Sequence, residues 1–415
     1  MNNELNRNID KVRWITLILV LLVGSTSAFL NCLSVYITPL AEKGWNPSVI
    51  VFAYTLMMFM AVFGSLIGGK LQQKIGNKNV LKVCGLGFMI AVIGASFATS
   101  AWIYVVLMGG VAPLFVYCIY VAQLGNLGAL FPERIGFVTG ALMVGIYGIG
   151  AVLVPLATTM TASMDVMTGI RILAISIGAI TIIAGFISIE APKGYAPKGW
   201  TAPAYSISDE EQEGMVIDTS WKKLITLRSF WILFIGQTVM GIFCAGAQGA
   251  FIPMAMSVTG CTEASAASSY SIFAILMGCS GLVIGFLSDK FWGPIKWVSF
   301  TAIVAAAFIF IFVFTGNTSY SLFVIFVVVL GITVGSSTTL LAVILMKAFG
   351  NKYFGVNFGI FNVAMLISSY VGPQLAVSEN INVFLGVGAA GLVIGAILFL
   401  IGGVSRNKET KIKLF

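Results

Sequence analysis

Residues 69–78 read GKLQQKIGNK, and residues 285–296 read GFLSDKFWGPIK. Both stretches begin with Gly-x-Leu and two polar residues, and both continue with a lysine, a glycine and a second lysine. Each stretch lies between two long apolar runs. A short basic turn that recurs at half-chain spacing between membrane-length runs indicates that the chain consists of two related halves.

The composition is that of a membrane protein. Of the 415 residues, 59% are hydrophobic and only 9% are charged, and the mean hydropathy is +1.01. Soluble domains have about 25% charged residues, and a helix needs about 20 apolar residues to cross a bilayer. Barrel strands would instead alternate over segments of about 10 residues. The sequence therefore predicts an all-α membrane protein with twelve transmembrane helices. The predicted spans are residues 14–38, 46–69, 79–98, 102–125, 135–160, 168–189, 229–256, 264–287, 297–315, 319–346, 354–377 and 382–404.

The positions of the positive charges predict the orientation. The formal net charge is +8, which in a soluble protein would suggest nucleic acid as a partner. With the N-terminus inside, however, all of the 23 Lys and Arg residues except Lys43 and Arg171 fall on segments expected in the cytoplasm. This bias is the positive-inside rule. We therefore expect a multi-pass protein of the cell membrane, plasma or inner, with both termini in the cytoplasm and no nucleic-acid partner.

A polar segment separates the two halves. Residues 191–228 contain three prolines and the acidic run 209–213, and they lack an apolar period. Their last eight residues, WKKLITLR, predict an amphipathic helix at the membrane interface. We therefore expect a six-helix bundle at residues 1–190, a cytoplasmic linker at 191–228 and a second six-helix bundle at 229–415. The linker is either a solvated tether or the site of a regulatory partner.

Polar side chains recur on one face of several predicted spans. Tyr117, Tyr120 and Gln123, for example, follow one another at intervals of three, which places them on one side of a helix. Because a polar group that faces lipid is costly, such side chains should face other helices or water. They either form interhelical hydrogen bonds or line a substrate path, and the sequence leaves both alternatives open. The candidate substrate-binding residues are Asn31, Ser34, Tyr117, Tyr120, Gln123, Tyr147, Gln248, Tyr270, Ser336, Asn362 and Ser369.

Ionisable residues are absent from the middle of the predicted spans. The sequence has no histidine, and all 15 Asp and Glu residues lie at span edges or outside the spans. Proton-driven carriers normally bind the proton on such a group inside the membrane, and only Glu263 and Asp165, at outer helix ends, are available for this role. We therefore expect exchange, facilitated movement, or co-transport in which the substrate itself carries the proton.

The chain lacks the motifs of catalysis and of cofactor binding. Its six cysteines have no metal-ligand or disulfide spacing, and five of them lie within predicted spans, where we expect them to act as small apolar packing residues. The sequence has no phosphate-binding loop and no His-based catalytic group. It therefore predicts no enzyme activity, no cofactor and no metal site.

The two basic turns resemble the loops between helices 2 and 3, and between helices 8 and 9, of the major facilitator superfamily. The first turn departs from the family pattern at Gln73, where the family usually has Asp, and at Asn77, where it often has Arg. The second turn keeps Asp289. The resemblance implies two pseudo-symmetric six-helix bundles that rock about a central substrate site, with the turns acting as gates. The residues concerned are Gly69, Lys74, Gly76, Lys78, Gly285, Asp289 and Lys290.

Three further stretches resemble one branch of that superfamily, the oxalate:formate antiporters and the related monocarboxylate transporters. These stretches are SVYITPL at residues 34–40, the Gly44–Trp45 turn, and FPERIG at residues 131–136. The resemblance implies that Tyr120 and Tyr147 contact the substrate.

Departures from this branch narrow the expected substrate. By the resemblance, the antiporters have an arginine near Gly281, a lysine at Ala364 or Met365, and a tyrosine at Asn31. Without these cations, a doubly charged anion such as oxalate would lack a counter-ion in a low-dielectric cavity. We therefore expect a monomeric transporter of a small, monocarboxylate-like anion. The alternatives are a transporter of a neutral or amphipathic solute, including drug efflux, and a non-transporting membrane sensor.

Overall fold

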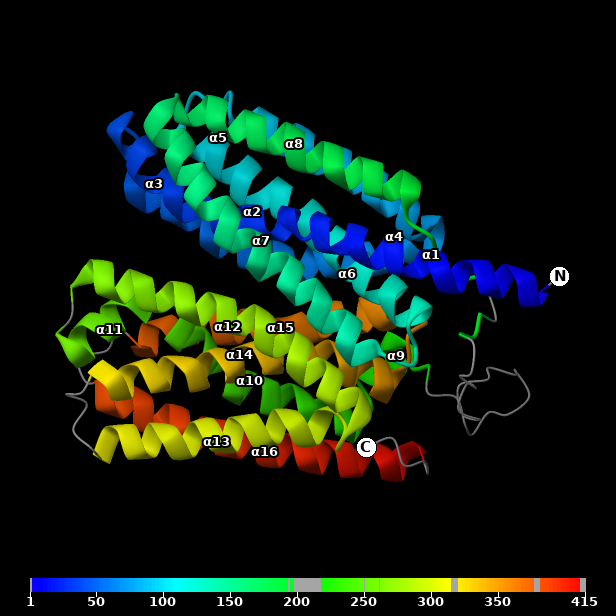
Figure 1. Cartoon of the computed structure of the whole chain (residues 1–415). Coiled ribbons are helices and arrows are strands. Elements are labelled where there is room, and N and C mark those ends of the chain that lie inside the picture. Colours follow the sequence, from blue (N-terminus) through cyan, green and yellow to red (C-terminus); the bar gives the residue numbers. More distant parts are fainter. Residues whose placement is uncertain are drawn as a thin grey trace. The chain divides into compact units, whose positions relative to one another are not determined.

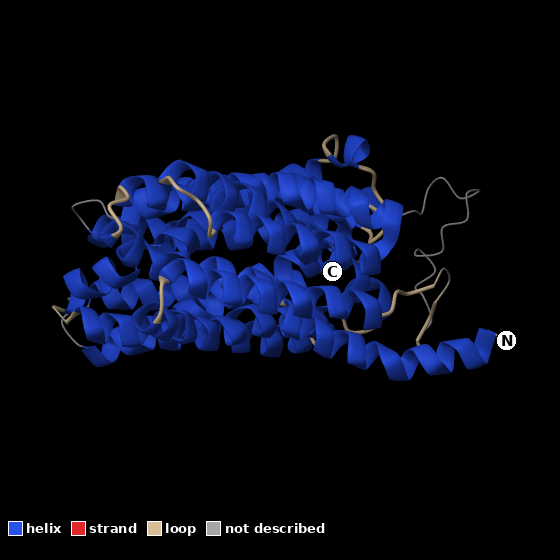
Figure 2. Ribbon diagram, turned by 90° about the horizontal axis from the view of Figure 1, so that it is seen from above, coloured by secondary structure: helices blue, strands red, loops and turns tan. Residues whose placement is uncertain are grey.

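The structure is a computed structural model that describes residues 2–192, 195–197, 218–249, 251–260, 262–314, 320–376 and 381–410. All regular elements within these ranges are helices (Figure 1, Figure 2). The first half contains α1 (Asn2–Val23), α2 (Ser25–Asn31), α3 (Leu33–Glu42), α4 (Pro47–Ala95), α5 (Ala101–Val105), the π-helix η1 (Val106–Val111), α6 (Ala112–Leu130), α7 (Ile135–Ser163) and α8 (Val166–Ile187). The second half contains α9 (Trp221–Leu224), α10 (Arg228–Gly249), α11 (Phe251–Thr259), α12 (Glu263–Lys290), α13 (Pro294–Phe314), α14 (Tyr320–Phe349), α15 (Phe354–Ala376) and α16 (Ile381–Thr410).

Eleven helical stretches of the described residues are long and apolar enough to cross a membrane. One of them, α4, has 49 residues and is about 74 Å long at 1.5 Å per residue, more than twice the ~30 Å hydrocarbon core. Within it, Gly76 has φ 79° and ψ 164°, which is not helical, so α4 consists of two spans that meet at the first basic turn. The predicted all-helical membrane fold is confirmed, and the division of α4 accounts for the twelfth span.

The first span is interrupted twice, at Gly24 and at Cys32, where α1, α2 and α3 meet. Gly24 lies against α7, because a Cβ atom added to it would be 2.7 Å from the carbonyl carbon of Gly145. A Cβ atom on Gly145 would in turn be 2.7 Å from the carbonyl oxygen of Leu21. Glycine at both positions lets the two backbones touch, as is common where membrane helices cross.

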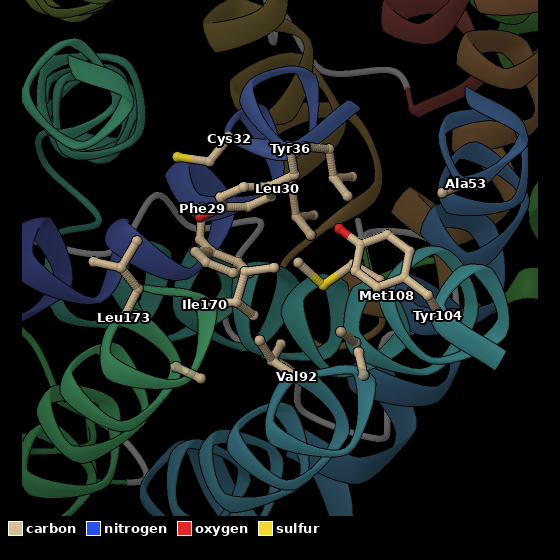
Figure 3. Close-up of a cluster of buried hydrophobic side chains, with 14 of the residues drawn as sticks. Phe29, Leu30, Cys32, Tyr36, Ala53, Val92, Tyr104, Met108, Ile170 and Leu173 are labelled. Carbon is tan, nitrogen blue, oxygen red and sulfur yellow. The ribbon is translucent and has the colours of Figure 1, made fainter. Parts of the chain in front are cut away.

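One compact unit comprises residues 1–203 and 353–362. In this first unit α4 packs along α6 and α8, and α7 packs against α1 and α2. Figure 3 shows part of the apolar core, to which α2, α3, α4, α5 and α8 contribute side chains. Members of this cluster include Phe29, Tyr36, Val92, Tyr104 and Ile170.

The span that begins with α5 is not a continuous α-helix, because η1 lies between α5 and α6. Pro113, at the start of α6, has no amide hydrogen, and its ring crowds the carbonyl group of the residue four positions earlier, Gly109. At Gly109 the backbone also approaches α4, since a Cβ atom there would be 2.7 Å from the Cα atom of Ala53. In a π-helix the hydrogen bonds reach back five residues instead of four. Pro113 therefore gives a local reason for the change of helix type.

The other compact unit comprises residues 204–352 and 363–415. In this second unit α10 packs along α16, α12 along α14, and α13 against α14 and α16. The backbones of α12 and α14 approach closely, because a Cβ atom on Gly335 would be 2.2 Å from the carbonyl oxygen of Met277. Residues 353–362, which lie within the predicted second bundle, cluster with the first unit.

Most of the expected linker, including the acidic run 209–213, lies outside the described residues. At its C-terminal end the helix is shorter than the sequence predicts, since α9 covers only Trp221–Leu224 and α10 begins at Arg228. The indole nitrogen of Trp231 donates a hydrogen bond to the carbonyl oxygen of Ile225, at 2.8 Å. This bond ties the turn between the two helices to α10.

Candidate functional site

Three tyrosines of the first unit lie close together. Tyr117 and Tyr120 are on α6 and Tyr147 is on α7, and all three side chains are partly buried. Tyr120 is near enough to both of the others for the hydroxyl groups to interact electrostatically. Its ring also lies 6.0 Å from that of Phe358, at the start of α15. The structure therefore places the tyrosines of α6 and α7 in one group.

Gln123 continues this face of α6, one turn after Tyr120. Its side chain is only 2% exposed, and its Nε2 atom has no hydrogen-bond partner among the described residues. A buried amide group without a partner costs about 1–3 kcal/mol. Gln123 is therefore a candidate donor for an oxygen atom that enters the site.

Asn31 and Ser34 lie where α2 gives way to α3, and both are exposed. The Ser34 hydroxyl donates to the backbone carbonyl of Asn31, at 3.1 Å. A Cβ atom on Gly150 of α7 would be 3.8 Å from the amide nitrogen of Asn31. Asn31 therefore faces α7 within one turn of Tyr147.

Asn362 takes part in helix packing within the first unit. Its side chain is buried, and its Nδ2 atom donates to the hydroxyl oxygen of Ser65 on α4, at 2.8 Å. Close by, a Cβ atom on Gly69 would be 2.4 Å from the carbonyl carbon of Gly355. The first residues of α15 thus meet α4 backbone to backbone, beside the start of the first turn.

In the second unit, the side chains of Gln248 and Tyr270 form a hydrogen bond with each other. The Tyr270 ring also packs edge-on against Phe251, with the ring centroids 5.4 Å apart. Ser369, on α15, is partly buried. The structure therefore joins Gln248 and Tyr270 in one polar pair beside an aromatic residue.

Ser336 forms hydrogen bonds that join two helices, which is the first of the two roles considered for the polar side chains within the spans. Its side chain is fully buried, and its hydroxyl group lies 3.0 Å from that of Thr301 on α13. It also donates to the carbonyl oxygen of Thr333, at 3.0 Å. These contacts join α13 to α14.

The first turn is held by the carboxylate of Glu190, which is not among the predicted gate residues. The backbone N–H of Lys78 donates to Glu190, just beyond α8, at 2.6 Å. Gly76 has a positive φ of 79°, and a Cβ atom on it would be 2.7 Å from both carboxylate oxygens of Glu190. Only glycine fits this position, for its conformation and for its space. Lys74 is exposed, and Lys78 is partly buried.

The second turn contains its own carboxylate. Asp289 lies 3.7 Å from the ammonium group of Lys347, in the last turn of α14. Asp289 therefore has a basic partner, Lys347, within the second unit. Gly285 is buried one turn earlier, and the ammonium group of Lys290 lies 4.6 Å from the ring centroid of Phe286.

A family model for the Major Facilitator Superfamily matches residues 16–373. The chain belongs to this superfamily. It is 24% identical over 296 residues to the uncharacterized MFS-type transporter YhjX of Escherichia coli (strain K12), over 68% of each chain. Its fold is similar to two crystal structures of FucP. One is of a variant of the E. coli fucose:proton symporter FucP, and the other shows FucP in the outward conformation. Each has a TM-score of 0.68 and 13% sequence identity, over 94% of this chain and 98% or 99% of FucP.

As a member of the major facilitator superfamily, the protein is a secondary transporter and not an enzyme. Its partners include a small-molecule substrate and the bilayer. The site of such a transporter must therefore recognise a solute and release it unchanged.

Two charged side chains near the predicted outer ends of helices, Asp165 and Arg171, form hydrogen bonds or ion pairs within the protein. Asp165 accepts hydrogen bonds from the backbone N–H groups of Met167 and Thr168, at 3.1 and 3.2 Å, and pairs with Lys43. The Lys43 hydrogen bond chiefly lowers the pKa of Asp165, so this carboxyl group is charged at neutral pH. Arg171 donates to the Ser96 hydroxyl, at 2.9 Å. The side chain of Glu263 lies outside the described residues.

Proposed function

We propose that this facilitator moves a small organic anion of the monocarboxylate type across the cell membrane by alternating access. The observation that carries the proposal is the group on α6 and α7, where Tyr120 lies near Tyr117 and Tyr147. One turn after Tyr120 on α6, the Nε2 atom of Gln123 is buried and has no hydrogen-bond partner among the described residues. Hydroxyl and amide N–H groups can donate to a carboxylate, and hydrogen bonds to an ionised acceptor are roughly twice as strong as neutral ones. We propose Asn31 and Ser34 as further substrate-binding residues of the first unit, and Gln248, Tyr270 and Ser369 as substrate-binding residues of the second unit.

The charge of the substrate follows from the groups available to balance it. The sequence has no histidine, and no lysine or arginine lies near the middle of a predicted span. One negative charge can be stabilised by several hydrogen bonds, whereas a second would remain uncompensated in a low-dielectric site. A monoanion, or the acid in its protonated form, fits these donors better than oxalate. Membership of the oxalate:formate and monocarboxylate branch is part of this proposal.

The lack of ionisable groups in the middle of the predicted spans also bears on how transport is coupled to proton movement. Asp165, one of the two acidic residues available for proton transfer, acts as a helix cap with a lowered pKa. We propose exchange of one anion for another, or co-movement of the anion with its own proton. FucP is described as a proton symporter, but at 13% identity its coupling is not evidence for this chain.

The alternative is a carrier for a neutral or amphipathic solute, including efflux of a drug-like molecule. The Gln248–Tyr270 pair beside Phe251 favours it, because amide, hydroxyl and aromatic groups also bind uncharged molecules. A membrane sensor that transports nothing is the third candidate function.

We further propose that the transporter is monomeric, that both termini are cytoplasmic and that the two basic turns act as gates.

The test is counterflow in proteoliposomes that contain the purified protein. Liposomes preloaded with formate, acetate or lactate should take up the labelled anion from outside, and Tyr120→Phe should slow this uptake at least tenfold. Tyr54→Phe, a change on α4 outside the proposed substrate path, serves as the matched control. Thermal stabilisation by neutral solutes alone would contradict the anion proposal. Uptake of a non-ionisable solute driven by a pH gradient would contradict the proposed coupling.

A further inference from the structure

Two large aromatic side chains are exposed on the surface of the protein in the turn between α12 and α13. Phe291 is 58% exposed and Trp292 is 60% exposed. Trp292 has a φ of 61° and is the one non-glycine residue with positive φ among the described residues. A bulky side chain is strained in this conformation. Gly293, the next residue, also has a positive φ of 76°. Glycine adopts this conformation without strain, whereas the tryptophan before it does not.

The aromatic residues around this turn form a cluster, which we define as Phe291, Trp292, Trp297 and Phe300. The Trp292 ring lies 5.4 Å from that of Trp297 and 5.9 Å from that of Phe300. The indole nitrogen of Trp297 donates to the carbonyl oxygen of Phe291, at 2.9 Å. This bond closes the turn, so the cluster is a fixed surface feature and not a set of independent side chains.

Two lysines flank the aromatic cluster. Lys290 precedes it and Lys296 lies within it in sequence, and both are exposed. Neither lysine belongs to an ion pair within the part of the chain that the structure describes. The surface therefore combines an exposed apolar group with two positive charges that have no internal counter-ion.

The first turn shows that a basic turn of this kind does not need the aromatic residues. Between its lysines, Lys74 and Lys78, it has Ile-Gly-Asn. The second turn has Phe291 and Trp292 in front of its glycine, one residue more than the first turn has there. The cluster is thus an addition specific to the second unit.

We propose that the aromatic cluster together with Lys290 and Lys296 binds the headgroup region of an anionic phospholipid. Tryptophan favours the boundary between headgroups and acyl chains, and lysines near the membrane surface attract anionic lipids. Charge complementarity selects this occupant over a zwitterionic lipid. The aliphatic part of each lysine can lie along the apolar surface while its ammonium group contacts phosphate. The site is separate from the proposed substrate site.

The test is native mass spectrometry of the full-length protein in detergent with added phosphatidylglycerol or phosphatidylcholine. The wild-type protein should retain phosphatidylglycerol in preference to phosphatidylcholine. The double variant Lys290→Gln/Lys296→Gln should bind phosphatidylglycerol roughly thirtyfold more weakly. The matched control is Lys352→Gln/Lys408→Gln, which removes two exposed lysines of the same unit and should leave this binding within about twofold of wild type.

Trp292→Gly separates lipid binding from folding. Glycine relieves the positive φ, so the melting temperature in detergent should stay the same or rise, while phosphatidylglycerol binding falls roughly tenfold. Equal retention of the two lipids by the wild type, or unchanged binding by the lysine double variant, would overturn the proposal. A wild-type dimer that Trp292→Gly abolishes would assign the surface to a second copy of the chain instead.

Discussion

In the first basic turn the carboxylate comes from Glu190, beyond the motif, and in the second it is Asp289, within the motif. Glu190 accepts a backbone N–H at the start of a helical segment, whereas Asp289 pairs with the side chain of Lys347. The first turn has Gln73 at the position where the resemblance predicts an acid. The repeated sequence therefore preserves the glycine and the lysines, while the source of the negative charge differs between the units.

The largest effect should come from Gly69, where the first turn begins. Gly69→Ala would place a Cβ atom 2.4 Å from the backbone of Gly355, and we expect a loss of about 3 kcal/mol in unfolding free energy because of overpacking. Unfolding by SDS titration measures it. The control is Gly94→Ala on the same helix, where the nearest neighbouring atom is 3.5 Å away. Equal stability of the two variants would show that the backbones do not meet at Gly69.

Asp289→Asn should have the next largest effect. Asp289 is 8% exposed and Lys347 is 28% exposed, so removal of the acid leaves a half-buried ammonium group without its partner. We expect a loss of about 2 kcal/mol, and the second change Lys347→Met should recover most of it. If the double variant is no more stable than the single one, the pair does not hold the second turn.

Glu190→Gln should have a smaller effect on the first turn. The amide oxygen can still accept the N–H of Lys78, but the negative charge at the helix start is lost, which is worth about 1 kcal/mol. Glu190→Ala, which removes both the charge and the acceptor, should lose more. SDS titration of the two variants side by side ranks them, and the reverse order would contradict the capping role.

The smallest effect concerns pH and the exposed pair of Asp165 and Lys43. Because the pKa of Asp165 is lowered in the folded protein, its stabilising contribution is present above the ordinary pKa of Asp, about 3.9, and is lost as the pH falls through the lowered value. Asp165→Asn keeps the cap but not the charge, and should cost a few tenths of a kcal/mol at pH 7. Melting temperatures of the two proteins at pH 3 and pH 7 check this, since the difference should shrink in acid.

The fold could be predicted from the sequence because the bilayer demands long apolar helices, and the charge-poor runs have that length. The grouping of Tyr117, Tyr120 and Gln123 follows from their spacing on one helix. The contacts of Ser336 and Asn362 could not be predicted, because sequence periodicity identifies a face but not the helix that covers it. Glu190 was missed because its partner is 112 residues away along the chain.

The π-helix η1 has a consequence for everything that follows it in the same span. A single π turn is equivalent to the insertion of one residue into an α-helix, and one residue corresponds to a rotation of about 100°. Deletion of one residue from η1 would therefore swing Tyr117, Tyr120 and Gln123 by more than a quarter of a revolution about the axis of α6. The direction in which all three side chains point depends on a single amino acid that precedes them.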